Sequence, residues 1–201
     1  LTVVVGIIGV LQIRTIVAAD TYLFEKMTSP LADLITIAED FQRVRLQMRN
    51  VSTASDQASL AAAQQEIGRL NEEIDAATAS FDKSVVTDKG RELVDAYKDQ
   101  LGSYRETADK VIDLVRRGDR ESALSLMNGD GAKAAAALQS AVDGIVKTKI
   151  DLSKATADGN EATGSRAVIL MLVFTLIAVL LAVILAVFLS RSISVPINRI
   201  V

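Results

Sequence analysis

The sequence contains no cysteine and no histidine among its 201 residues. Without cysteine the chain can form no disulfide bond and offers no thiolate nucleophile. Without histidine it lacks the commonest general base and a usual ligand of zinc and haem. We therefore predict no catalytic residue, no cofactor and no metal site, and we expect that this chain is not an enzyme.

Proline and aromatic residues are also scarce, with two prolines and 4% aromatic residues beside 50% hydrophobic residues. This balance is unusual for a globular domain, and the dominance of alanine, leucine and charged residues is typical of long helices. The net charge is −3, and no basic patch is interleaved with aromatic residues. We therefore expect no nucleic acid among the partners.

One long apolar run is present instead, from Ala167 to Leu189, without charge, proline or glycine. About 20 such residues, at a rise of 1.5 Å each, cross a hydrocarbon core of roughly 30 Å. We therefore predict a transmembrane helix over residues 166–189. The tail that follows, residues 190–201, carries two arginines and no acid. Because a cationic excess close to a span favours the cytoplasmic side, we expect this tail in the cytoplasm.

The chain begins at Leu1, without methionine, in a second apolar stretch that runs past a single Arg14. The first ten residues are too few to span a bilayer alone. We interpret residues 1–17 as the end of a truncated first transmembrane helix in a piece of a longer protein, with Arg14 reaching the interface. A cleaved signal peptide is the alternative interpretation. Residues 18–165 then form a domain outside the membrane.

The domain between the predicted spans has helical periodicity almost throughout. Its apolar residues recur mostly at alternating steps of three and four, which is the spacing of packed helices. The four series are Leu34, Ile37, Phe41, Val44, Met48 and Val51; Leu60, Ala63, Ile67, Leu70, Ile74, Ala77 and Phe81; Leu93, Tyr97, Leu101, Tyr104, Ala108, Val111 and Val115; and Leu138, Val142, Ile145, Thr148, Leu152 and Ala155. We predict an all-α fold, an up-down-up-down antiparallel four-helix bundle continuous with two transmembrane helices.

The breaks between these series contain residues that begin helices. The segment NVSTASD offers Ser55 or Asp56 as the N-cap of the second helix. The segment VTDKG offers Thr87 or Asp88 in the same way for the third helix. Short polar side chains at these positions accept hydrogen bonds from the first free backbone N–H groups of a helix.

Glycine and proline mark two further boundaries. Gly118 and the segment Asn128 to Gly131 bracket a short helix before the fourth long helix begins. Pro30 fits two interpretations. It begins a new helix with Ser29 as the cap, or it kinks a helix that runs on from the first span.

This arrangement resembles the four-helix-bundle sensor module of methyl-accepting chemotaxis proteins. The most recognisable segment is Tyr22 to Asn50, and the tail SRSISVPINRI resembles the opening of a HAMP linker, with Pro196 at the position that the linker favours. The resemblance implies an extracytoplasmic sensory module in the inner membrane of a bacterium. Such a module detects a small molecule and passes a helix displacement through the second span to HAMP and a cytoplasmic signalling domain.

The resemblance leaves other functions open. Similar modules precede histidine kinases and diguanylate cyclases, so the output domain is not given. Sensing can be direct, or it can depend on a periplasmic binding protein. A third possibility is a passive membrane-anchored bundle that holds two copies together without any ligand.

A second series lies beside the core series on the first helix and runs from apolar to cationic: Leu31, Ile35, Ala38, Gln42, Arg45 and Arg49. A second series implies a second packing partner, most simply the same helix of another copy, so we expect a homodimer. Buried arginines would repel across the two-fold axis unless an anion lies between them. The resemblance likewise implies that Arg45, Arg49 and Arg43 contact the ligand. Alternatively, these arginines lie in water and pair with acids such as Asp40.

The third helix carries further candidate ligand-binding residues. Tyr97 and Tyr104 are two turns apart and would line one groove together with Arg105. The alternative for the two tyrosines is core packing with the hydroxyl at the edge of the core.

Overall fold

The computed structural model describes the backbone of residues 2–197 and the side chains of residues 6–191. The described residues are helical apart from short turns, and none of them forms a strand. The predicted all-α class is therefore confirmed. The chain divides into two compact units: Leu23–Lys154 form one, and the segments before Leu23 and after Lys154 form the other.

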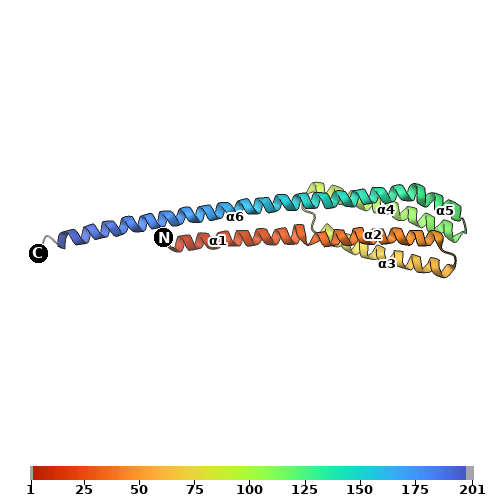
Figure 1. Cartoon of the computed structure of the whole chain (residues 1–201), viewed down its shortest axis with the longest axis horizontal. Helices are drawn as coiled ribbons and strands as arrows, with labels where there is room; N and C mark the ends of the chain where they lie inside the picture. The colour runs from red at the N-terminus through yellow and green to blue at the C-terminus, as the bar shows by residue number, and fades with distance from the viewer. Residues whose placement is uncertain (1, 198–201) are drawn as a thin grey trace. The chain divides into compact units, whose positions relative to one another are not determined.

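The unit Leu23–Lys154 is a bundle of long helices that lie side by side (Figure 1). Its long helices are α2 (Pro30–Thr53), α3 (Gln57–Asp82), α4 (Asp88–Arg116) and the first part of α6 (Ala132–Ile197). Its shorter elements are the π-helix η1 (Leu23–Thr28), α5 (Arg120–Leu126) and the π-helix η2 (Met127–Gly131).

The core of this bundle consists of the apolar series that the sequence predicts. Every member of the α2 and α3 series is buried, and Leu70 and Val51 are 0% exposed. The α4 series is buried except for the partly buried Leu93, and on α6 the buried members are Leu138, Val142 and Ile145. Burying each large apolar side chain contributes about 1.5–3 kcal/mol, so this continuous core stabilises the bundle along its length.

Contacts at the two ends of the bundle are consistent with the predicted up-down-up-down order, which stays a prediction. At the end that holds the α3–α4 turn, Lys26 Nζ donates to the carbonyl of Lys83 at 3.3 Å. At the end that holds the α2–α3 turn, Arg120 donates to the carbonyl of Ala54, the residue after α2. We call these the α3–α4 end and the α2–α3 end.

Side-chain caps mark the N-terminal ends of α3 and α4, as the sequence predicts. Asp56 caps α3: its Oδ1 accepts from the Ser59 N–H at 2.7 Å, and the Ser59 hydroxyl accepts from the Asp56 N–H. Thr87 Oγ1 caps α4 by accepting from the Gly90 N–H at 3.0 Å. The hydrogen bonds from Ser59 also lower the pKa of Asp56, because they stabilise the carboxylate.

The predicted short helix is present as α5, but the predicted break in helical structure at Asn128 to Gly131 is wrong. These residues are π-helical and lead directly into α6. A Cβ atom at Gly131 would lie 3.3 Å from the carbonyl oxygen of Leu126 and 3.9 Å from a methyl group of Thr107. Glycine therefore permits close packing here, where its local tendency would favour a turn. Gly118, with φ of +81°, follows α4 and adopts the left-handed conformation that glycine tolerates.

At Pro30 the structure favours the second interpretation, a helix that continues through this position, rather than a new helix capped by Ser29. The Ser29 side chain makes no capping hydrogen bond, and its backbone is helical, with φ of −56° and ψ of −42°. The Ser29 N–H donates to the carbonyl of Phe24 at 2.8 Å, five residues back. This longer reach is typical of a π-turn, and a π-turn is one recognised cause of a local kink.

The second unit contains α1 (Thr2–Tyr22) and the later part of α6, which lie side by side (Figure 1). Asn160 Nδ2 donates to the carbonyl of Ala19 at 3.1 Å. Large apolar side chains on α6 are exposed, with Leu172 at 65% and Phe188 at 67%. The stretches Gly6–Thr53 and Arg120–Arg191 are each long and apolar enough to cross a membrane, by length and composition.

The predicted domain boundaries, 1–17, 18–165, 166–189 and 190–201, stay predictions. The same holds for the HAMP start at Pro196, which falls in the last turns of α6 but outside the residues whose side chains are described.

Candidate functional site

A cavity of about 270 Å³ opens to solvent towards the α2–α3 end of the bundle. Three of the bundle's elements and the π-helix η2 contribute its walls. Its lining includes Gln42, Arg45, Met48 and Arg49 from α2, Tyr104, Thr107, Ala108 and Val111 from α4, Met127 and Asn128 from η2, and Ala132 and Ala135 from α6. The cavity therefore combines an apolar floor with a polar and cationic rim.

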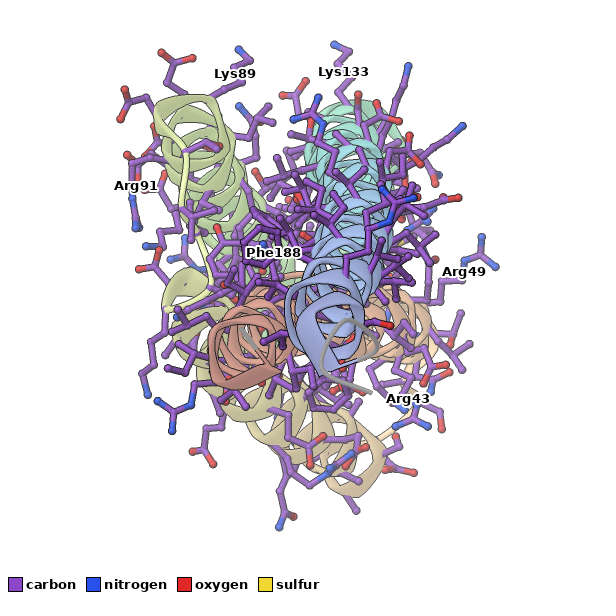
Figure 2. All side chains as sticks on the ribbon, turned by 90° about the vertical axis from the view of Figure 1, so that its left-hand side faces the viewer. Arg43, Arg49, Lys89, Arg91, Lys133 and Phe188 are labelled. Atoms are coloured by element: carbon purple, nitrogen blue, oxygen red, sulfur yellow. The ribbon has the colours of Figure 1, made fainter. Side chains whose placement is uncertain are left out.

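Arg45 and Arg49 supply the positive charge of this rim. Both side chains are exposed, and neither has an acidic partner within ion-pair distance among the described residues. Arg45 Nη1 donates to Gln42 Oε1 at 2.9 Å, and its guanidinium lies 6.0 Å from the centroid of the Phe41 ring. Figure 2 shows Arg49 extending away from the helices. Most of the donors of both guanidinium groups are therefore available to a solvent-borne anion.

A chain of hydrogen bonds leads from Arg45 to α6. Gln42, which accepts from Arg45, donates through Nε2 to Gln139 Oε1 at 2.7 Å. Gln139 Nε2 in turn donates to Asp143 Oδ1 at 2.9 Å. Gln139 and Asp143 both lie on α6, so the cationic rim on α2 is joined directly to that helix.

Tyr104 lies against the apolar floor and is 6% exposed. Its ring packs edge-on against Phe41, with centroids 5.0 Å apart and an interplanar angle of 82°. Burial raises the pKa of Tyr104 to about 12, and the nearby charge of Arg45 opposes that rise. The hydroxyl has no hydrogen-bond partner among the described residues. Tyr104 therefore stays neutral at physiological pH and keeps a donor for a ligand.

Arg43, the third arginine predicted on this helix, lies elsewhere. Its Nη1 pairs with Asp40 Oδ1 at 3.2 Å, and it lines a separate open groove between α2 and α3. Burial raises the pKa of Asp40, with Glu73 adding to the rise and Arg43 opposing it. Figure 2 shows Arg43 pointing outward from the bundle. For Arg43, the structure fits the alternative of pairing with an acid.

The other two candidates on α4 also lie apart from the cavity. Tyr97 is buried, its hydroxyl lies 3.1 Å from Thr78 Oγ1, and burial raises its pKa. Arg105 pairs with Asp75 at 2.9 Å and also donates to Asn71. The structure therefore brings Arg45, Arg49 and Tyr104 together, whereas Tyr97 and Arg105 face α3. A role in ligand binding for all six residues stays a prediction.

Sequence reasoning missed the contributions of η2 and of the polar side of α4. Asn128 and Thr107 line the cavity beside the two arginines. No periodic signal marks Asn128, because it belongs to a π-helix in a segment that reads as a turn. Among the described residues, no group of three or more acidic side chains is arranged to hold a metal ion.

These features define a helical bundle with a solvent-open cavity. A family model described as a four helix bundle sensory module for signal transduction matches residues 1–163, and the chain belongs to this family. The family resemblance found in the sequence is thereby confirmed, and the family is one of sensory modules rather than enzymatic domains. A comparison with curated proteins found no match.

Proposed function

We propose that this chain is the extracytoplasmic sensory module of a bacterial chemoreceptor, a methyl-accepting chemotaxis protein, and that it binds a small anion at the cavity. One observation carries this proposal: Arg45 and Arg49 lie at the cavity without an acidic partner among the described residues. Arg43, Arg69 and Arg105, by contrast, all pair with acids.

The chemistry of the cavity favours a small carboxylate with a short apolar part. Two guanidinium groups and the neutral hydroxyl of Tyr104 offer donors to the carboxylate. Met48, Val111 and Ala135 offer an apolar surface below them. A volume of about 270 Å³ lies just below the range typical of drug-sized ligands, which favours a compact molecule.

The hydrogen-bond chain from Arg45 through Gln42 to Gln139 offers a route for the signal. An anion that draws Arg45 into the cavity competes with Gln42 for the guanidinium, and Gln42 is bonded to α6. Displacements of about 1–2 Å at helix interfaces are a known form of switching, provided that the ligand binds the two packings unequally. We propose that α6 passes such a displacement through the second span to the HAMP linker and the cytoplasmic signalling domain.

The proposed receptor is a homodimer in the bacterial inner membrane, with the bundle in the periplasm or outside the cell. Ile35, in the second series of α2, is 58% exposed, and Leu46, about three turns further along α2 at the cavity, is 55% exposed. These apolar side chains support a second copy as the packing partner. The tail at residues 190–201, with two arginines and no acid, supports a cytoplasmic C-terminus.

Three alternatives can be distinguished by experiment. The same module can precede a histidine kinase or a diguanylate cyclase, which changes the output but not the cavity. A passive dimerisation bundle is the alternative of another class, and the unpaired arginines at the cavity favour a ligand over it. A periplasmic binding protein, as the direct partner, would make free acids inactive.

The test is a thermal-shift screen of the whole chain in lipid nanodiscs against small carboxylates, amino acids and aromatic acids. A ligand present at 100 times its dissociation constant stabilises the folded state by about 2.7 kcal/mol. We expect one class of acid to raise the melting temperature of the wild type, and the double variant R45A/R49A to lose that shift.

The matched control is K110A/R117A, which removes two exposed cations of α4 and its C-terminus that do not line the cavity. This variant should keep the full shift. If no acid stabilises the wild type, direct anion sensing is wrong, and a binding-protein partner or a passive bundle takes its place.

A further inference from the structure

Lys149 is the one lysine or arginine that is buried among the side chains that the structure describes, with 6% exposure. It lies on α6, and its Nζ donates to the carbonyl and to the hydroxyl of Ser84, each at 3.1 Å. The ammonium also lies 5.3 Å from the centroid of the Phe81 ring. Its donors are therefore committed to the segment that ends α3.

A second lysine holds the same segment from another element. Lys26 of η1 donates to the carbonyl of Lys83, next to the residue that Lys149 holds. The last carbonyl groups of a helix have no partner within it and carry partial negative charge. Two ammonium groups from two different elements thus converge on the C-terminal end of α3.

The positions of the two lysines along the chain give this arrangement its significance. Lys26 follows Tyr22, the last residue of the N-terminal segment of the other unit, by four residues. Lys149 precedes Lys154, the last residue of the bundle unit, by five residues. The segment Lys83 to Ser84 belongs to neither connection, so it serves as a common anchor for both.

Burial of this ammonium does not make it a strong source of stability. Desolvation penalises its charged form, and the nearby charge of Lys26 adds to that penalty, so the pKa of Lys149 is lowered. Replacing a buried ion pair by well-packed apolar side chains is often neutral for stability, and Lys149 has no acidic partner among the described residues that its removal would leave uncompensated. An apolar side chain at this position would pack against α3 at several axial positions of α6, whereas the hydrogen bonds from Lys149 to Ser84 form at only one.

We propose that Lys149 locks α6 at one axial position by holding the C-terminal end of α3, and that the sensory response breaks the Lys149–Ser84 hydrogen bonds. The second half rests on the proposed sensory function, whereas the first half does not. A sliding movement of about 1–2 Å would be enough to break these bonds. Along the line between donor and acceptor, such a movement would lengthen the 3.1 Å separation beyond hydrogen-bonding range.

The test measures the position of α6 in the whole chain in lipid nanodiscs. Because the sequence has no cysteine, two introduced cysteines carry spin labels without background. Ala79 on α3 and Ala137 on α6 are exposed label sites. Ala79 precedes Ser84 by five residues, whereas Ala137 precedes Lys149 by 12 residues, so the two labels lie at different levels along the bundle. The distance between the labels therefore has a large axial component, and pulsed electron resonance reports it.

We expect one narrow distance in the wild type and a broadened or shifted distribution, by about 1–2 Å, in Lys149→Met, whose unbranched side chain is one heavy atom shorter and carries no charge. The control is Lys147→Met, an exposed lysine two residues away on the same helix, and it should match the wild type. A Lys149→Met distribution identical to that of the wild type overturns the lock.

The melting temperature of Lys149→Met should stay within about 4 °C of the wild type. If this variant does not fold, Ser84→Ala replaces it, because that change removes one of the two acceptors and leaves the carbonyl. Ser84→Ala should broaden the distance less, and an unchanged distance then overturns the lock. An acid that binds the wild type without moving its distance towards that of the unlocked variant overturns the signalling half alone.

Discussion

The two ends of the bundle treat their cations differently. At the α2–α3 end, Arg45 and Arg49 are exposed and have no acidic partner among the described residues. At the α3–α4 end, Lys149 is buried and donates two hydrogen bonds to Ser84. All three are cations on helices of one bundle. Most donors of the exposed guanidinium groups face solvent, whereas the buried ammonium donates to the protein. We infer that the number of protein partners, rather than the charge itself, separates the proposed binding role from the proposed positioning role.

Charge reversal gives the largest expected difference between the two ends. Lys149→Glu would place a buried carboxylate against the carbonyl of Ser84, where an acceptor faces an acceptor, and we expect it to destabilise the fold by about 3–5 kcal/mol. Arg45→Glu changes an exposed side chain, and we expect a change within about 0.5 kcal/mol. Urea unfolding followed by circular dichroism measures both. Equal losses in the two variants would contradict the distinction.

The two tyrosines of α4 sharpen the comparison at smaller cost. Tyr97→Phe removes a buried hydrogen bond to Thr78, so we expect it to lower the free energy of unfolding by about 1 kcal/mol. Tyr104→Phe removes a hydroxyl that has no protein partner among the described residues, so stability should change by less than about 0.5 kcal/mol.

In a binding titration with the acid found by the screen, the variant with the smaller effect on stability should have the larger effect on affinity. Tyr104→Phe should weaken binding about fivefold, the equivalent of one neutral hydrogen bond, and Tyr97→Phe should leave it unchanged. A Tyr104→Phe variant that binds normally would remove Tyr104 from the site.

The smallest expected effect is a pH dependence at the α3–α4 end. The pKa of Lys149 is lowered from the ordinary value of 10.5, so the unfolded chain binds more protons than the folded one between the two values. The free energy of unfolding should therefore rise with pH through that window, and this increment should be missing in Lys149→Met. Lys26 is the charged group that contributes to the shift, through its charge. Taking the difference between the two proteins cancels the ionisation of Tyr97 and Tyr104.

The helical core was predictable from sequence because its causes are local. A helix repeats every 3.6 residues, so a series such as Leu34, Ile37 and Phe41 defines one face without knowledge of its neighbours. The caps Asp56 and Thr87 were predictable for the same reason, since each accepts from an N–H group three residues ahead.

Lys149 was left out of the predicted α6 series because of its residue type, although its spacing fits that series. The predicted α6 series included Thr148, which is only partly buried, and passed over Lys149, which is 6% exposed. Leu138, Val142, Ile145, Lys149 and Leu152 follow steps of four, three, four and three without interruption. Lysine is almost never fully buried unless its charge is paired, so the regular spacing was outweighed by that tendency.

The candidate site was predictable only in part, because it depends on which helices meet. Tyr97 and Tyr104 belong to one series on α4, yet Tyr97 meets Thr78 of α3 and Tyr104 meets Phe41 of α2. Spacing along one helix gives the face but not the neighbour. The contribution of Asn128 depends on a π-turn that packing imposes on a segment with the composition of a turn.

The π-helix η2 also makes the wall of the cavity adjustable by chain length. A π-turn holds one residue more than an α-turn, because its hydrogen bonds reach five residues back instead of four. Loss of a single codon within Met127–Gly131 would convert it into an α-turn, and the flanking helices α5 and α6 would keep their faces because the π-turn closes the same turn with one extra residue. The side chains of this segment, Met127 and Asn128 among them, would then be placed differently along the cavity wall while the rest of the bundle kept its core. A change in gene length by three nucleotides is thus a short evolutionary route to a differently shaped cavity.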